Sequence, residues 1–338
     1  MSALAAPALL EAAEPAEVRG HGRDDVRLLV AHRDGLISRA RFDELPELLA
    51  PGDLLAINVS ATLPAAVPVR GPQPGLRLHL SSPAPDRGEA CWFVELRAGG
   101  ERFHGGEAGE ALPLPAGGTA VLLEREPGGR LWLAALRLPA AVPHYLARHG
   151  EPIRYGHATR EWPLRRYQTV YANAPGSAEM PSAGRAFTPE LVTQLVAAGI
   201  DVAPLVLHTG VSSLEAGEEP HPEWFHVPRF TAERINLARA LGGRVIAVGT
   251  TAVRALESAV DAEGRVKERE GWTGLIIRPD TPIRAIDGLL SGFHDSDSSH
   301  LEMLEAIAGA ELLERLYEEA AAAGYLRHEF GDLHLILP

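Results

Sequence analysis

The stretch from Val67 to Leu138 constrains the fold more than any other part of the chain. Short apolar runs recur in it, at residues 76–80, 91–96, 120–124 and 131–138, and clusters rich in glycine and proline separate them. No pattern with the period of a helix is present. Short strands at regular spacing, with turn signals between them, predict a small antiparallel β-barrel.

After Pro143 the pattern becomes an alternation of helices and strands. Thr188-Pro189 is typical of a helix start, with threonine as the N-cap and proline at the first helical position. We expect helices over residues 189–199, 231–241 and 301–323, the last one long and amphipathic, and strands over residues 202–207, 244–248 and 333–337. Strands that alternate with helices indicate an α/β sheet domain.

A strand of the larger domain precedes the barrel region. Leu54–Ala56 is a short apolar run after the Pro51-Gly52 turn, so the barrel interrupts the α/β domain. The sequence therefore predicts a mixed α/β sheet domain over residues 1–66 plus 143–338. The small antiparallel β-barrel is inserted in it as residues 67–142.

Composition limits the compartment and the class of protein. The 338 residues are 46% hydrophobic, enough for a sizeable core, and no apolar run is long enough to span a bilayer. The first ten residues lack the basic start of a signal peptide, and a single Cys91 cannot form an internal disulfide, so we expect a cytoplasmic protein. A net charge of −13 argues against indiscriminate coating of nucleic acid.

The segment VIAVGTTAVRALES, residues 245–258, contains the sharpest local motif. An apolar strand enters the turn Gly249-Thr250-Thr251, and a helix begins at once. Free backbone N–H groups and two hydroxyls at such a helix start can hold an anionic group. Arg254 and Glu257 are three residues apart on one face of that helix. The alternative is an ordinary strand–helix connection capped by threonine.

A long loop rich in small residues, 175–187, follows the segment YQTVYA at 167–172. It leads into a helix N-terminus, and long loops in compact α/β domains are often binding loops. A plain surface excursion is the alternative. The sequence contains no dinucleotide fingerprint, phosphate-binding P-loop, serine-hydrolase elbow or zinc-protease motif, which disfavours those classes.

Histidines and acids suited to proton transfer occur in three places. His208 follows the predicted strand at 202–207, His221 and Glu223 lie in a proline-rich segment, and His294 follows an apolar turn. Carboxyl ends of strands in α/β sheets usually meet ligand, which favours His208. A metal site of His208, His221, Glu223 and His226 has no familiar ligand spacing, so we expect none. Each of these histidines taken alone is more often a structural hydrogen-bonding residue.

Arginines and aromatic residues interleave between His144 and Tyr171. Arginine supplies phosphate contacts and aromatic rings stack on bases, so this stretch is the best candidate for nucleic-acid contact in an acidic chain. A solvated face beside acidic neighbours is the alternative. The residues that we assign to RNA contact are Arg154, Arg160, Arg165 and Arg166.

Together the motifs resemble those of the S-adenosylmethionine:tRNA ribosyltransferase-isomerases of queuosine biosynthesis. The matching segments span almost the whole chain and follow the family's order: PGDLLxxN at 51–58 with Pro64, YQTVYA at 167–172, P-G-S…P-S-A-G-x-x-F at 175–187, L-H-x-G at 207–210, H-x-E at 221–223, VGTTxVRxLES at 248–258, Asp287, Phe293-His294 and Gly331-Asp332. The family's fold, a mixed α/β domain carrying a small β-barrel, agrees with the pattern above.

The resemblance implies transfer of the ribosyl portion of S-adenosylmethionine to a 7-aminomethyl-7-deazaguanine already in tRNA. A base removes a proton from the ribose 5′ carbon, the amine attacks the sugar, adenine departs, and an epoxide closes as methionine leaves. The product is epoxyqueuosine in tRNA. S-adenosylmethionine is then a cosubstrate, and the partners are this cosubstrate and tRNA, with no further cofactor, metal ion or membrane.

The implied site divides into two sets of residues. The candidates for proton transfer are His208, His221, Glu223 and His294. The candidates for substrate binding are Tyr167, Gln168, Gly176, Pro181, Ala183, Gly184, Phe187, Gly249, Thr250, Thr251, Arg254 and Glu257.

Several positions depart from the family pattern, and most fall in loops that form the site. An arginine is missing at Ala61 and a histidine at Ala186, while residues 212–214 and 295–296 also differ. These departures leave two alternatives open: a family member with a small-molecule or nucleobase acceptor, and a non-catalytic relative that binds nucleotide or RNA.

Overall fold

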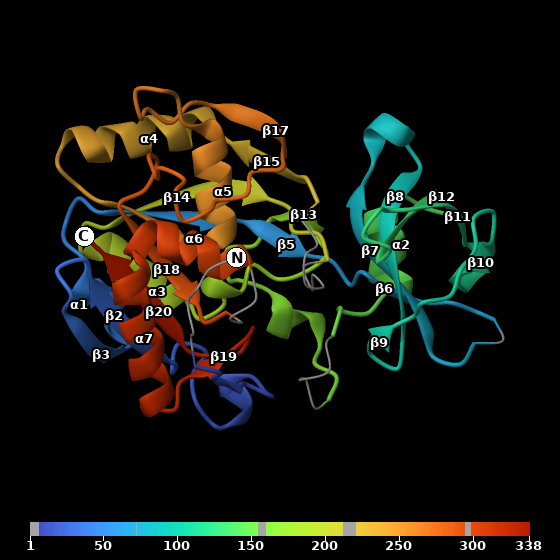
Figure 1. Cartoon of the computed structure of the whole chain (residues 1–338), viewed down its shortest axis with the longest axis horizontal. Coiled ribbons are helices and arrows are strands. Elements are labelled where there is room, and N and C mark those ends of the chain that lie inside the picture. The colour runs from blue at the N-terminus through green and yellow to red at the C-terminus, as the bar shows by residue number, and fades with distance from the viewer. Residues whose placement is uncertain (1–6, 72, 155–159, 212–220, 295–298) are drawn as a thin grey trace.

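The large domain of this computed structural model is built on a nine-stranded mixed sheet (Figure 1). The structure describes residues 7–71, 73–154, 160–211, 221–294 and 299–338. In spatial order the strands are β17 (Arg269–Thr273), β15 (Glu223–Val227), β14 (Asp201–Leu207), β4 (Leu54–Asn58), β16 (Val245–Val248), β18 (Gly288–Gly292), β20 (Leu333–Leu337), β2 (Arg27–His32) and β3 (Ile37–Arg41). The four central strands β14, β4, β16 and β18 are parallel, so their carboxyl ends meet at one edge.

Helices cover both faces of this sheet. One core joins its strands to α4 (Arg229–Ala240), α5 (Thr250–Ala259), α6 (Ser299–Ala308) and α7 (Ala310–Ala322). The opposite core joins them to α1 (Leu45–Leu48) and α3 (Pro189–Ala197). Because the central strands are covered on both faces, their sequences are apolar without alternation, as in β16, where all four residues are apolar and buried.

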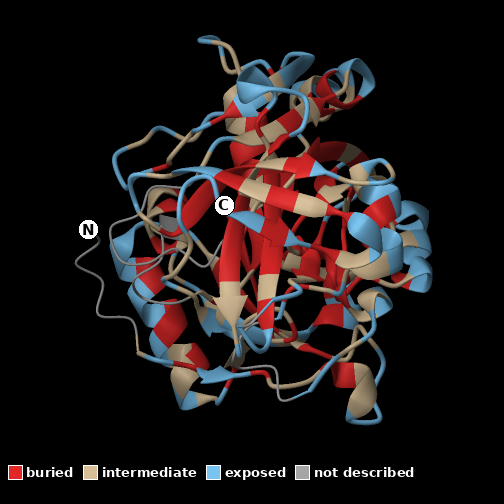
Figure 2. Cartoon of the chain, turned by 90° about the vertical axis from the view of Figure 1, so that its right-hand side faces the viewer, coloured by how far each residue is buried: buried red, intermediate tan, exposed pale blue. Residues whose placement is uncertain are grey.

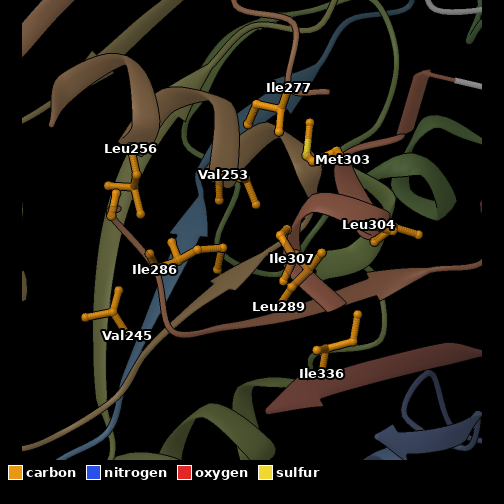
Figure 3. Close-up of a cluster of buried hydrophobic side chains, with 14 of the residues drawn as sticks. Val245, Val253, Leu256, Ile277, Ile286, Leu289, Met303, Leu304, Ile307 and Ile336 are labelled. Carbon is orange, nitrogen blue, oxygen red and sulfur yellow. The ribbon is translucent and has the colours of Figure 1, made fainter. Parts of the chain in front are cut away.

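The first core is packed mainly by aliphatic side chains. Figure 3 shows side chains of this core, among them Val253 and Leu256 from α5, Leu304 and Ile307 from α6, and Leu289 of β18. Figure 2 shows the result for the whole chain, with buried residues concentrated in the strands and exposed residues on the outer helices and loops. The central strands therefore rest on a close-packed core.

The predicted elements of this domain are largely confirmed. The side chain of Thr188 accepts a hydrogen bond from Leu191 N at 3.1 Å, so the N-cap of α3 is formed, a contact worth about 1 kcal/mol. The strands expected at 54–56, 202–207, 244–248 and 333–337 are β4, β14, β16 and β20, and the helix expected at 231–241 is α4.

The expectation of one long C-terminal helix over residues 301–323 is wrong. The chain forms α6 and α7 instead, with Gly309 between them at a φ of 81°. A left-handed conformation ends a helix and suits glycine, which has no Cβ to clash. Apolar spacing runs through both helices because both pack on the same core, so periodicity alone did not reveal the break.

The small unit is a curled antiparallel sheet of seven strands, as predicted. Its strands are β6 (Ala66–Pro68), β7 (Leu76–Pro83), β8 (Cys91–Ala98), β9 (Glu101–Arg102), β10 (Ala111–Pro113), β11 (Thr119–Arg125) and β12 (Leu131–Arg137). The edge strands β6 and β10 approach each other, and just past β6 the N–H of Arg70 donates to Pro113 O at 2.8 Å. In the strand order of the described residues β6 and β10 are nevertheless the two unpaired ends, so the sheet is a half-barrel. It stands beside the large domain in Figure 1.

The core of the small sheet extends past both ends of the predicted insertion. Helix α2 (Val142–His149) packs on β6 and buries Tyr145 and Leu146 in that core, together with Leu63 and Ile153. The domain boundaries at 66/67 and 142/143 stay a prediction. Two short parallel pairs complete the fold: β1 (Leu10–Glu11) with β19 (Leu326–Arg327), and β5 (Ser60–Thr62) with β13 (Ala174–Ser177).

None of the helices in the described part of the chain is long and apolar enough to cross a membrane.

Candidate active site at the carboxyl ends of the parallel strands

Asn58, at the end of β4, ties three neighbouring segments together. Its amide N–H group donates to Leu207 O at 2.9 Å and to Thr251 Oγ1 at 3.1 Å. Its carbonyl oxygen accepts the backbone N–H groups of Ser60 and Leu207 at 3.0 and 3.1 Å. A buried asparagine that uses both ends of its amide fixes the ends of β4 and β14 against the start of α5.

Gly249 forms the predicted tight turn before α5. Its φ is 88°, and a Cβ there would lie 3.2 Å from the Cβ of Ala183, so glycine suits both the backbone and the space. Its carbonyl accepts the N–H groups of Ala252 and Val253. Among the residues that the structure describes, the backbone N–H groups of Thr250 and Thr251 have no hydrogen-bond partner. This helix start therefore has the free donors that an anionic ligand requires.

His208 follows β14 and is held by two serines. Its Nδ1 lies 2.7 Å from Ser60 Oγ, which lies 2.6 Å from Ser177 Oγ. The imidazole stacks on Trp224, with ring centroids 5.2 Å apart, and a Cβ on Gly176 would lie 2.4 Å from the ring. Burial lowers the pKa of His208 to about 4, so the ring is neutral at neutral pH.

Glu223 and Arg254 form a buried ion pair beside this histidine. One carboxylate oxygen of Glu223 binds the Arg254 guanidinium, and the other accepts Gly210 N–H at 2.9 Å. Arg254 also donates to Leu275 O and Thr273 O. Burial raises the pKa of Glu223, and the charge of Arg254 opposes that rise. The pair anchors the segment His208–Gly210 to α5.

His294 follows β18 and lies among other aromatic side chains. Its backbone N–H donates to the Tyr317 hydroxyl at 3.0 Å, its Nε2 lies 3.2 Å from Ser291 Oγ, and its ring is 4.5 Å from that of His300. Burial, followed by the charges of neighbouring histidines, holds its pKa well below the usual range. Burial, followed by the charge of Arg254, also lowers the pKa of His300. Phe293 and Tyr317, which flank His294, pack in the same core as α5, the helix that carries Arg254.

His221 lies elsewhere, against the small sheet. Its ring is 5.1 Å from that of Phe93 in β8. The structure thus places His208 against Trp224 and binds Glu223 to Gly210, two residues after His208, while His221 contacts the small sheet. In the described residues no group of three His, Cys, Asp or Glu side chains has the geometry to hold a metal ion.

The loop 175–187 packs tightly under the site. A Cβ on Gly184 would lie 2.0 Å from the Tyr171 hydroxyl, while Ala183 and Phe187 are buried in the core. Phe187 packs edge-on against Phe42 at 5.1 Å. Of the predicted binding residues in this loop, Gly176 and Ala183 reach the site, through His208 and Gly249. Pro181 precedes the short helix Ser182–Gly184.

Three other predicted binding residues have partners within the protein. Gln168 uses both ends of its amide on the backbone of Thr62, at 3.0 and 2.7 Å. The Tyr167 ring is buried against Phe330, and this burial raises its pKa to about 12. The Glu257 carboxylate accepts the backbone N–H groups of Arg284 and Ala285. Arg254 pairs with Glu223 and not with Glu257, although Arg254 and Glu257 are three residues apart on one helix.

Most of the arginines assigned to RNA are in ion pairs. Arg154 pairs with Glu161 at 3.3 Å, Arg160 with Glu14 at 3.8 Å, and Arg166 with Glu17 at 2.8 Å. Arg165 is exposed, and in the described part of the chain its side chain has no ion-pair partner. The interleaved Tyr155 and the departures at 212–214 and 295–296 lie outside the described residues.

Glu17 is the centre of an arginine cluster that sequence reasoning missed. It binds Arg185 at 2.7 Å, Arg166 at 2.8 Å and Arg23 at 3.4 Å. Burial alone would raise its pKa, but the hydrogen bond and charge of Arg185, with the charge of Arg166, hold it at about 2. The guanidinium of Arg185 lies over the Phe330 ring at 4.9 Å. Two elements more than 160 residues apart in sequence meet here, so no local signal identified it.

The small sheet contacts the site through Val211. Val211 N–H donates to Ser81 Oγ of β7 at 2.9 Å, and Arg130 Nη2 donates to Val211 O at 3.3 Å. Arg130 Nη1 lies 3.7 Å from the fully buried carboxylate of Glu95. The segment that begins at His208 is therefore fixed from both domains.

Sequence reasoning also missed Asn58, Ser60, Ser177 and Trp224 as site residues. Asn58 and Ser177 lie inside motifs of the family pattern, which was the signal available.

Comparisons with known proteins cover nearly the whole chain. A family model described as "Queuosine biosynthesis protein" matches residues 4–336. The chain is 37% identical over 331 residues to a protein of Symbiobacterium thermophilum and 36% identical over 326 residues to one of Thermus thermophilus, both named S-adenosylmethionine:tRNA ribosyltransferase-isomerase. These matches cover 93% of this chain and 94% and 93% of the relatives.

A solved structure shares the fold. It is the S-adenosylmethionine tRNA ribosyltransferase of Thermotoga maritima, with a TM-score of 0.56 and 29% sequence identity over 98% of this chain and 99% of that one.

Proposed function

The chain belongs to the queuosine biosynthesis protein family, and we propose that the carboxyl edge of its large sheet is where it acts on S-adenosylmethionine and tRNA. Its activity is that of an S-adenosylmethionine:tRNA ribosyltransferase-isomerase. The observation that carries this function is the match at about one third identity along 93% of the chain. The reaction transfers the ribosyl portion of the cosubstrate to 7-aminomethyl-7-deazaguanine in tRNA and gives epoxyqueuosine, adenine and methionine.

The start of α5 is the proposed anchor for S-adenosylmethionine. The N–H groups of Thr250 and Thr251 are open donors at the positive end of a ten-residue helix, which suits the carboxylate of the methionine portion. Asn58 orients Thr251 from β4. Arg254 is already neutralised by Glu223, so we assign it a positioning role, holding Gly210 through that carboxylate.

Proton transfer is proposed for Glu223 or His294, and His208 is a further polar group at this edge of the sheet. Removal of a proton from the ribose 5′ carbon needs a base, and burial raises the pKa of Glu223 in the direction that a base requires. His208 and His294 are neutral because burial lowers the pKa of each. The proposed chemistry uses S-adenosylmethionine as a cosubstrate and calls for no metal ion.

Arg160 and Arg165 are the proposed contacts for tRNA phosphates, since both are exposed. Arg154 is a further candidate, because its pair with Glu161 is solvent-exposed and therefore weak. An acceptor of this kind is consistent with a cytoplasmic enzyme.

A product assay tests the function. The protein is incubated with S-adenosylmethionine and with tRNA that carries 7-aminomethyl-7-deazaguanine, and adenine and methionine are quantified with the modified nucleoside. We expect release of both products only when this tRNA is present. Release driven by the free base would instead identify a small-molecule acceptor, and no release with either acceptor would contradict an enzymatic role.

A further inference from the structure

The hydroxyls of Ser177 and Ser60 form a chain that ends at Nδ1 of His208. Both serines are fully buried, and the two hydroxyl oxygens are 2.6 Å apart. Ser60 Oγ is 2.7 Å from His208 Nδ1. At the other end, Ser177 Oγ accepts the backbone N–H of Thr209 at 3.0 Å. Each member has a partner, so the directions of the hydrogen bonds can be worked out.

Matching hydrogen-bond donors to acceptors gives the series Ser177, Ser60 and His208 one favoured direction. Ser177 already accepts from Thr209, and in the part of the chain that the structure describes its own hydrogen has only Ser60 Oγ as an acceptor. Ser60 then donates to His208 Nδ1. The reverse direction would leave the buried Ser177 hydroxyl hydrogen without an acceptor, a loss that favours the first arrangement by roughly tenfold or more.

We propose that Ser177 and Ser60 hold His208 as the tautomer protonated on Nε2, so that His208 donates a hydrogen bond to S-adenosylmethionine and does not act as the base. The proposal rests on the proposed function and deepens it. The ring is partly exposed, and its Nε2 has no hydrogen-bond partner within the described ranges, which leaves that N–H available. Stacking on Trp224 and contact with Gly176 fix the plane of the ring.

A neutral N–H donor suits one step of the reaction. As the bond between ribose and adenine breaks, its electron pair stays with the purine. A hydrogen bond from Nε2–H stabilises that negative charge until the purine takes up the proton that the attacking amine releases, while His208 keeps its own proton. Removing a donor of this kind from an active site typically lowers kcat by about 10²–10³. The base for the 5′ carbon must then be another residue, and we assign that role to Glu223, whose carboxylate binds Gly210 in the segment that contains His208.

The tautomer is measured directly by nitrogen NMR. In protein labelled with 15N-histidine at neutral pH, the His208 signals are assigned by their absence from His208→Gln. We expect a protonated Nε2 and an unprotonated Nδ1 in the free enzyme, and a shift of the Nε2 signal when S-adenosylmethionine is added without tRNA. A protonated Nδ1, or an Nε2 signal that saturating S-adenosylmethionine does not move, overturns the proposal.

Two substitutions separate a donor from a base. Glutamine offers an amide N–H near the position of Nε2 and cannot accept a proton, whereas alanine offers neither. We expect His208→Gln to retain at least tenfold more kcat than His208→Ala, with similar KM for tRNA. Equal losses in the two variants would indicate a base and overturn the proposal.

Ser60→Ala tests the positioning role. We expect mixed His208 tautomers in its NMR spectrum and kcat at least tenfold lower, with folding retained. Ser82→Ala is the matched control, since Ser82 is a buried serine in β7 of the small sheet and is not in the hydrogen-bonded chain. A Ser60→Ala spectrum with a fixed Nε2–H signal contradicts the proposal. Wild-type protein with the expected tautomer but no adenine release would contradict the proposed function alone.

Discussion

Glu223 on β15 and Arg254 on α5 form an ion pair that is almost closed to solvent, with 13% and 10% of their side chains exposed. The other carboxylate oxygen of Glu223 accepts Gly210 N–H, so the pair also sets the position of the segment that contains His208. Removing one member of a buried pair leaves the other as an uncompensated charge, whereas removing both need not.

We therefore expect Glu223→Gln to lower the free energy of unfolding by about 3–5 kcal/mol in urea titrations at pH 7. The double variant Glu223→Leu with Arg254→Met should be more stable than Glu223→Gln, because no charge remains buried. Arg229→Ala is the control, since its pair with Glu233 is exposed to solvent and therefore weak. If the free energy of unfolding falls no more in Glu223→Gln than in this control, the predicted cost of breaking the buried pair is wrong.

The Glu17 cluster predicts a loss of stability in acid. The pKa of Glu17 is about 2 in the folded protein and near 4.5 in the unfolded chain, so its contribution is complete above about pH 4.5 and is lost as the pH falls toward 2. At pH 7 this contribution is at most about 3 kcal/mol. We expect Glu17→Gln to be destabilised at pH 7 and to show a shallower decline below pH 4.5. Chemical denaturation at a series of pH values provides the measurement. If the free energy of unfolding changes with pH in parallel for Glu17→Gln and wild type, the predicted contribution of Glu17 is wrong.

Exposed arginines should carry the salt dependence of tRNA binding. Reversing the charge in Arg160→Glu plus Arg165→Glu should weaken binding and reduce the slope of log K against log salt by about one for each phosphate that is no longer neutralised. Arg229→Glu, an exposed arginine on α4, is the control. Arg166 is left intact because it pairs with Glu17. Filter binding over a range of salt concentrations provides the measurement, and equal slopes for the double variant and the control would disprove the assignment.

Asn58 should be required for both folding and cosubstrate binding. In Asn58→Ala the N–H groups of Ser60 and Leu207 lose a buried acceptor, and we expect about 2–3 kcal/mol of destabilisation. Thr251 also loses its hydrogen bond with β4, so the Kd for S-adenosylmethionine should rise by about tenfold or more, the equivalent of one hydrogen bond at the anchor. Calorimetry at a temperature where the variant is folded measures that Kd. An unchanged Kd would remove the start of α5 from the cosubstrate site.

Local patterns were enough to predict most elements of the fold. Strands such as β4 and β16 are short apolar runs bounded by turn residues, and the Thr188-Pro189 start of α3 is a local capping signal. The break at Gly309 was missed because the apolar spacing continues across it. When a single glycine occurs in a helical pattern, the sequence does not show whether the helix tolerates it or ends there.

The site could be predicted only in part, because its contacts join distant segments. The Gly249-Thr250-Thr251 turn and His208 were identified from their place after strands. The partner of Arg254 was not, since Glu223 is 31 residues away while Glu257 is one helical turn away. Ser60 and Ser177 are 117 residues apart and meet only through the parallel pairing of β5 with β13. Neither hydroxyl has a sequence signal of its own.

Val211 belongs to the large domain by its place in the chain and to the small sheet by its hydrogen bonds with Ser81 and Arg130. A change at either of these positions alters the placement of a backbone segment at least 81 residues downstream, close to His208. Selection on the activity of the large domain therefore also limits which substitutions the half-barrel can accept at these two positions. We expect substitutions at Ser81 to be accompanied by changes near Val211, so that the two domains evolve as one unit and are not exchanged separately between relatives.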